Sequence, residues 1–92
     1  MIEIYTTATF DELFLRLPKK IQIKADKKAI LFRQNPFNPT LRTEKLHPKG
    51  HDVWRFRVDI NYRIVFKFTG KDSVEFRFVG HHNDIYDYNI FG

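Results

Sequence analysis

Residues 53–86, VWRFRVDINYRIVFKFTGKDSVEFRFVGHHNDIY, alternate large apolar side chains with charged ones in three successive runs. Side chains of a strand point alternately to the two faces of its sheet, so the pattern predicts three strands that share one apolar and one polar face. The predicted apolar face carries Trp54, Phe56, Val58, Tyr62, Ile64, Phe66, Phe68, Val74, Phe76 and Phe78. The opposite face carries Arg55, Arg57, Asp59, Arg63, Val65, Lys67, Glu75, Arg77 and Val79. We therefore expect other elements to cover the first face, and the second, rich in guanidinium groups, to stay open to anions.

The residues before this stretch predict a short strand and two helices. Residues 1–5 alternate as a strand does, and Thr9 with Glu12 has the spacing of a capping box at a helix start. Four apolar residues then recur with the period of an amphipathic helix: Phe10, Leu13, Phe14 and Leu17. Pro18 ends this helix and suits the first turn of another, which we expect over residues 18–34.

A loop with two prolines follows at 35–39, and residues 41–47 are an expected edge strand. Turns at 59–61 and 69–72 separate the three main strands. The order strand, helix, helix and then four strands predicts a single α+β domain over residues 1–92. Its two N-terminal helices should pack on one face of a mainly antiparallel sheet of about four to five strands.

Composition narrows the class of protein. A chain of 92 residues is long enough for one core. It has no Cys, which excludes disulfides, thiolate catalysis and Cys-based zinc sites. Neither a signal-peptide pattern nor an apolar run near the roughly 20 residues of a membrane span occurs, so we expect a cytoplasmic protein with no membrane segment. The net charge of +5 favours an acidic partner, either nucleic acid or protein.

Several short motifs, each present once, are spread along the whole chain. They are Leu17-Pro18-Lys19, Asn35-Pro36-Phe37, Leu41 to Leu46 (LRTEKL), Trp54, Tyr62 to Phe66 (YRIVF) and Gly80 to Tyr86 (GHHNDIY). In this order and spacing the chain resembles the RelE/ParE superfamily of toxins from type II toxin–antitoxin modules, and most closely the RelE branch with its YafQ-like members. The resemblance implies a RelE-like fold and an endoribonuclease that needs no metal or cofactor. Such enzymes cut messenger RNA, usually on the ribosome, and a cognate antitoxin protein blocks them.

The implied reaction is attack of a ribose 2′-OH on the adjacent phosphate, which leaves a cyclic phosphate and a 5′-OH. It needs a base, cations for the phosphorane and an acid for the leaving oxygen. The resemblance assigns the phosphate contact to Arg63 and the acid to His82, and it places Tyr86 where its side chain would stack on an RNA base or donate a hydrogen bond near the cut. The candidate RNA-binding residues are Arg55, Arg57, Arg77 and His47. Without the resemblance, Arg63 would be taken as paired with Asp59 or Glu75, His82 as a cap on the last strand, and Tyr86 as a core residue.

Two departures from the family pattern leave questions open. Glu44 stands where many relatives carry a histidine, so the base is Glu44, His47 or His51. Asn83-Asp84 replaces the Asp-Glu that often follows the catalytic histidine. If the last strand continues through this pair, we expect His81 to point away from His82. The spacing of the four histidines fits no usual metal motif. The alternatives are a ParE-like inhibitor of DNA gyrase that acts by binding, and an inactive relative.

Overall fold

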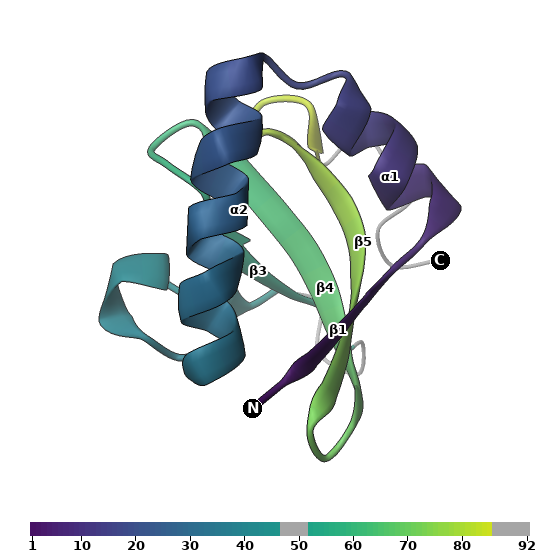
Figure 1. Cartoon of the computed structure of the whole chain (residues 1–92), viewed down its shortest axis with the longest axis vertical. Helices are drawn as coiled ribbons and strands as arrows, with labels where there is room; N and C mark the ends of the chain where they lie inside the picture. The colour runs from purple at the N-terminus through teal and green to yellow at the C-terminus, as the bar shows by residue number, and fades with distance from the viewer. Residues whose placement is uncertain (47–51, 86–92) are drawn as a thin grey trace.

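The computed structural model describes residues 1–46 and 52–85, and within them two helices cover one face of a five-stranded sheet (Figure 1). In chain order the elements are β1 (Glu3–Thr6), α1 (Ala8–Leu15), α2 (Lys19–Gln34), the 3₁₀ helix η1 (Pro39–Leu41), β2 (Glu44–Lys45), β3 (Trp54–Arg57), β4 (Tyr62–Gly70) and β5 (Ser73–His81). The strand order is β1-β5-β4-β3-β2, with β1 parallel to β5 and the other neighbours antiparallel. The predicted α+β class is confirmed, and the parallel β1 makes the sheet mixed.

Helix α1 begins earlier than the capping-box spacing predicted. Its N-cap is Thr7, whose hydroxyl accepts a hydrogen bond from the Phe10 N–H at 3.1 Å, so Thr9 lies inside the helix. Tertiary contacts select Thr7: its N–H donates to the Phe76 carbonyl and its hydroxyl to the Arg77 carbonyl, both in β5. The prediction for Thr9 was wrong because the capping-box spacing is a purely local signal, whereas hydrogen bonds to β5 select Thr7 as the N-cap.

The main core lies between the helices and the sheet. At its centre, the fully buried Phe32 of α2 contacts Phe56, Phe66 and Phe76 with ring centroids 4.9, 4.9 and 5.4 Å away. The buried members are Phe10, Leu13, Ile21, Ala25, Phe32, Leu41, Phe56, Val58, Ile64, Phe66, Val74, Phe76 and Val79. Most of the predicted apolar face therefore packs under α1 and α2 as expected.

A bulge in β5 changes the side-chain alternation. Val65 pairs with Phe78, but the next pair is Phe66 with Phe76, so Arg77 is an extra residue in β5. Val79 consequently joins the main core, and Phe78 shares the face of Val65. The prediction placed Phe78 and Val79 on the opposite faces and was wrong, because an inserted residue exchanges the faces of everything beyond it.

The face predicted to be open is partly covered. A second cluster of buried residues forms on it: Leu46, Val53, Val65 and Ile85. The strand expected over 41–47 is also shorter, because η1 occupies its start and Arg42 follows in a left-handed conformation with φ 52°. Only Glu44–Lys45 pairs with β3, and His47 lies outside the described residues.

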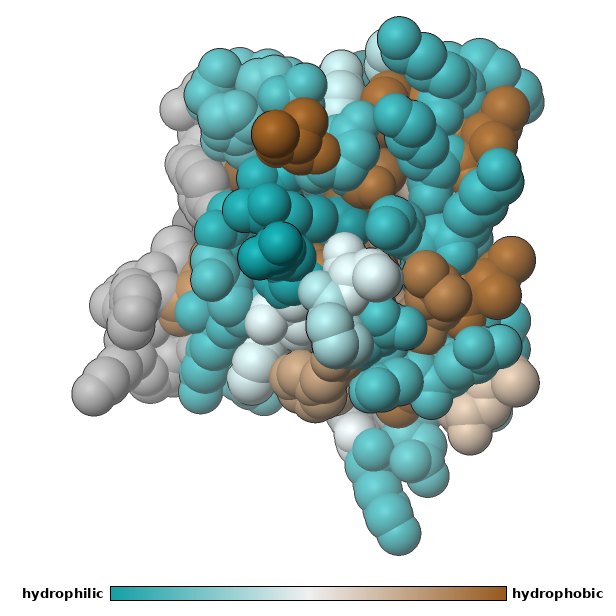
Figure 2. Space-filling view, turned by 90° about the vertical axis from the view of Figure 1, so that its left-hand side faces the viewer, coloured by the Kyte–Doolittle hydropathy of each residue, from teal (hydrophilic) through white to brown (hydrophobic). Residues whose placement is uncertain are grey.

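The outer surface is mostly polar. Lys19, Lys20, Lys24 and Lys27 of α2 are exposed, as expected for a solvated helix face. Figure 2, which views the left-hand side of Figure 1, shows a largely hydrophilic surface broken by separate hydrophobic patches. Across residues 1–46 and 52–85, no helix has the length and apolar character needed to cross a membrane.

Candidate functional site

Two arginines face each other across the sheet. Arg57 of β3 pairs directly with Arg63 of β4, and Arg63 in turn pairs with Gly80 of β5. Like charges directly opposite each other destabilise a strand pair unless an anion compensates them. Among residues 1–46 and 52–85, no ion pair involves Arg57. The cross-strand pair therefore concentrates positive charge at one end of the sheet.

Arg63 is buried, with 6% of its surface exposed. Its Nη1 donates to the backbone carbonyls of Asp59 (2.8 Å), Ile60 (3.0 Å) and Tyr62 (3.2 Å), all in or beside the β3–β4 turn. The prediction of an exposed guanidinium on an open face was wrong for this residue, because its Nη1 turns inward and donates to backbone carbonyls in and beside the β3–β4 turn. The sequence pattern gives the face of Arg63 but not this backbone contact.

The carboxylate of Asp59 accepts hydrogen bonds from backbone N–H groups of the same turn. Its Oδ1 accepts hydrogen bonds from the N–H groups of Asn61 (2.8 Å) and Tyr62 (2.9 Å), and its Oδ2 lies 3.4 Å from Lys24 Nζ. Burial alone would raise the pKa of the Asp59 carboxyl. The two backbone N–H groups and Lys24 outweigh burial, so the pKa of Asp59 lies below its ordinary value. The turn that holds Arg63 is thus fixed by an ionised carboxylate.

His82 lies at the same end of the sheet as the arginine pair. Its N–H donates to the Asn61 carbonyl at 2.7 Å, which continues the β4–β5 ladder one step beyond the Tyr62–His81 pair. Strand spacing and rise then place its backbone about 8 Å from that of Arg63 and about 12 Å from that of Arg57. The His82 side chain is half-buried. His82 and the two arginines therefore lie at the same end of the sheet, and we refer to these three residues as the cluster.

The ring of His81 stacks on the ring of His82, with centroids 4.6 Å apart and planes inclined by 25°. The expectation that His81 points away was wrong, because β5 ends at His81 and the chain turns. The Asn83 N–H donates to His81 Nδ1 (3.1 Å), and the Asp84 N–H donates to the His81 carbonyl (2.9 Å). Sequence reasoning missed His81, although the adjacent pair of histidines was a visible signal.

The structure does not bring Glu44 to this cluster. Glu44 pairs with Arg55 in the β2–β3 register, and Arg55 Nε donates to its carboxylate at 2.8 Å. The ladder places the Glu44 backbone three strands and about four residues away from His82, on the order of 20 Å. Arg77 is also engaged, with its Nε 3.6 Å from the Glu75 carboxylate. Arg55 and Arg77 are therefore partly neutralised.

The other predicted site residues, His47, His51 and Tyr86, lie outside the described residues. No group of three or more His, Asp or Glu side chains suited to a metal ion occurs within 1–46 and 52–85.

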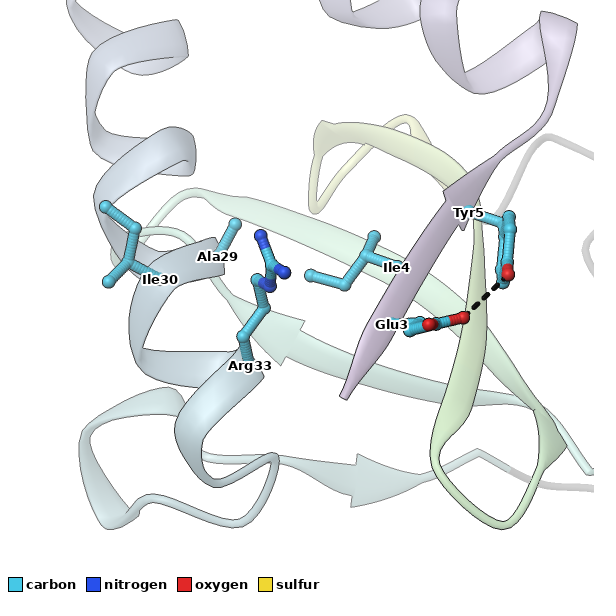
Figure 3. Close-up of a pocket in the computed structure, with 6 residues that line it drawn as sticks. All are labelled: Glu3, Ile4, Tyr5, Ala29, Ile30 and Arg33. Atoms are coloured by element: carbon cyan, nitrogen blue, oxygen red, sulfur yellow. Dashed lines mark hydrogen bonds between the residues drawn. The ribbon is translucent and has the colours of Figure 1, made fainter. Parts of the chain in front are cut away.

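A separate cavity of about 430 Å³ lies between β1 and α2, away from these residues (Figure 3). It is lined by Glu3, Ile4, Tyr5, Ala29, Ile30 and Arg33. The Tyr5 hydroxyl donates to the Glu3 carboxylate at 2.7 Å, and this hydrogen bond raises the pKa of Tyr5. The cavity contains none of the predicted site residues.

Comparison with solved structures identifies the family. The chain is 34% identical to a protein in the RelB–RelE antitoxin–toxin complex from Methanococcus jannaschii, with a TM-score of 0.69 over 92% of this chain and 98% of the other. It also shares its fold with the YoeB/ParE toxin from Agrobacterium tumefaciens (16% identity, TM-score 0.73, 88% and 99% covered) and YafQ from E. coli (16%, 0.72, 90% and 96%). No family model and no curated protein matches the sequence. The chain belongs to the RelE/ParE superfamily of toxins from type II toxin–antitoxin modules.

Proposed function

We propose that this toxin is a metal-independent endoribonuclease that cleaves messenger RNA by attack of a ribose 2′-OH on the adjacent phosphate. The observation that carries the proposal is the Arg57–Arg63 cross-strand pair beside His82. Two arginines paired across neighbouring strands, at the end of the sheet that carries a half-buried imidazole, fit a phosphate group that gains negative charge and then loses an alkoxide.

Each residue of the cluster has a separate role. Arg57, which is half-buried and forms no ion pair within residues 1–46 and 52–85, contacts a phosphate oxygen. Arg63, held by three carbonyls, contributes fixed positive charge that needs no rearrangement during the reaction. His82 protonates the 5′ oxygen as it leaves.

We propose that Glu44 positions Arg55 rather than acting as the base. Its hydrogen bond with Arg55 and its distance from His82 support this role. A base and an acid that act on one phosphate must both lie within hydrogen-bond reach of it. His47 and His51 remain the candidate bases from the sequence, and Tyr86 the candidate stacking residue.

The proposed partners follow from the family. The relative from Methanococcus jannaschii was solved as an antitoxin–toxin complex with RelB. We propose that a cognate antitoxin with acidic and apolar residues binds this chain, whose net charge is +5, and that the chain acts in the cytoplasm on mRNA at the ribosome.

The test is induced expression followed by mapping of RNA ends. Wild type should arrest growth and leave cyclic-phosphate and 5′-OH ends, and EDTA should not slow cleavage by the purified protein. His82→Ala should lower the cleavage rate by about 10²- to 10⁴-fold, the usual contribution of a general acid. Arg57→Ala should lower it by about 10²-fold, while the exposed Arg33→Ala is the matched control. Arg57 is preferred to Arg63 because removing Arg63 also breaks the turn.

Three results would overturn the proposal. Undiminished arrest by His82→Ala would exclude the proposed acid. Arrest with intact RNA and stalled DNA gyrase would instead favour the gyrase inhibitor, and a lack of arrest without antitoxin would indicate an inactive relative.

A further inference from the structure

A cavity of about 190 Å³ lies where the end of α1 meets the ends of β4 and β5. Its lining includes the apolar Leu13 and Leu17, the aromatic rings of Tyr62 and His81, and two charged residues, Arg16 and Asp84, which we call the rim residues. Both rim residues are exposed, and no ion pair joins them in the described part of the chain.

The cavity adjoins the proposed active site through one side chain. The His81 ring stacks on His82 at 4.6 Å and meets the Tyr62 ring edge to face at 5.5 Å. Asn83 N–H fixes the orientation of His81 by donating to Nδ1. A group bound against His81 would therefore lie next to the residue that we assign as the acid.

Size and lining restrict what the cavity takes. Pockets for drug-sized ligands begin at roughly 300 Å³, so this smaller cavity suits a single planar ring system. Tyrosine and histidine rings are surfaces on which unpaired RNA bases stack. The rim combines an acceptor-only carboxylate with a donor-only guanidinium.

That combination distinguishes guanine from adenine. Guanine presents N–H donors at N1 and N2 to a carboxylate, and acceptors at O6 and N7 to a guanidinium. Adenine presents a ring nitrogen lone pair to the carboxylate where guanine presents an N–H, and this opposes its binding.

We propose that this cavity binds one unpaired base of the RNA beside the scissile phosphate and prefers guanine, with Asp84 and Arg16 reading its edges and one of the two rings, Tyr62 or His81, stacking on it. The inference rests on the proposed nuclease function and adds the source of its sequence preference.

The test uses a 2′-O-methyl RNA, which cannot be cleaved, with guanine replaced by inosine at each position in turn. Inosine lacks only the 2-amino group, so one position should show wild-type binding weakened by about tenfold, within the range for loss of a base-reading contact. In Asp84→Asn the guanine-to-inosine ratio at that position should fall to about one, while Asp26→Asn, an exposed carboxylate on α2, keeps it. Arg16→Gln should lower the guanine preference, with Arg33→Gln as its control.

The proposed pocket would be contradicted if Asp84→Asn left the ratio of affinities for guanine-containing and inosine-containing RNA unchanged. It would also be contradicted if this variant lost antitoxin binding without any change in base preference. Mapped cleavage ends separate the two proposals. Wild type that cleaves with a base preference indifferent to Asp84 contradicts the pocket alone, whereas wild type that cleaves no RNA contradicts the nuclease.

Discussion

Asp59 and Arg63 fix the β3–β4 turn with opposite chemistry. The carboxylate of Asp59 accepts from two backbone N–H groups, and the guanidinium of Arg63 donates to three carbonyls. Asn61, which holds His82 through its carbonyl, belongs to the same turn. These two side chains therefore position the proposed acid without touching it.

The depressed pKa of Asp59 gives a pH-dependent stability. Its ionised form is favoured in the folded state, so its contribution is complete above the unfolded pKa of about 4 and is lost as pH falls through the lower folded value. Asp59→Ala should reduce the free energy of unfolding at pH 7 by about 1 to 2 kcal/mol. In urea titrations the difference from wild type should narrow below pH 4. A difference in unfolding free energy that stays constant down to pH 2 would contradict the role of the ionised Asp59 carboxylate. Asp59→Asn keeps one acceptor oxygen and should therefore lose less stability than Asp59→Ala.

Phe32 is the residue on which the main core depends most. It is fully buried and contacts three aromatic rings of the sheet. Phe32→Ala should cost about 3 to 5 kcal/mol of unfolding free energy, because it leaves a cavity between α2 and the sheet. Leu15→Ala, at a side chain 75% exposed, should cost less than about 0.5 kcal/mol. Chemical denaturation measures both, and similar costs would contradict the described packing.

At the scale of elements, β5 determines both where α1 begins and which side chains lie on each face of the sheet. Its Phe76 and Arg77 carbonyls bind Thr7, and its bulge moves Val79 into the core. The end of β5 at His81 produces the turn that stacks the two histidines. One strand therefore links the folding of the helix layer to the geometry of the site.

Capping of α1 provides a matched pair of variants. Thr7→Ala should destabilise the protein by about 1 kcal/mol, because it removes the acceptor for the Phe10 N–H. Thr9→Ala, inside the helix, should be neutral or slightly stabilising, since alanine has the higher helix propensity. Thermal unfolding of both variants checks that Thr7 is the N-cap. A larger loss of stability in Thr9→Ala than in Thr7→Ala would instead indicate Thr9 as the cap.

At the scale of the whole molecule, the positive charges of the sheet differ in whether a carboxylate neutralises them. Arg55 and Arg77 are paired with carboxylates at one part of the sheet, whereas Arg57 and Arg63 oppose each other at the end that carries His82. Binding of single-stranded RNA should therefore depend on few arginines rather than on total charge.

The salt dependence of RNA affinity measures the number of phosphate contacts that the protein makes. For uncleavable single-stranded RNA, Arg57→Ala should reduce the slope of log affinity against log salt by about 0.7, the value for one phosphate contact. Arg33→Ala, on α2, should leave the slope unchanged. Fluorescence anisotropy at several salt concentrations gives both slopes, and equal changes would indicate diffuse binding.

The sequence by itself determined the fold class and most of the core. Period-two alternation of aromatic residues identified the strands of the sheet, and the spacing of Phe10, Leu13 and Phe14 identified α1. The order of the motifs identified the superfamily, and the position of His82 beside a basic strand was visible in the same stretch.

Only the tertiary structure decided the bulge at Arg77, the burial of Arg63 and the stacking of His81 on His82. Each depends on partners distant in sequence or on the exact residue where a strand ends. Periodicity assigns a side chain to a face, but the backbone carbonyls, turns and strand register that meet it there are set by the assembled sheet.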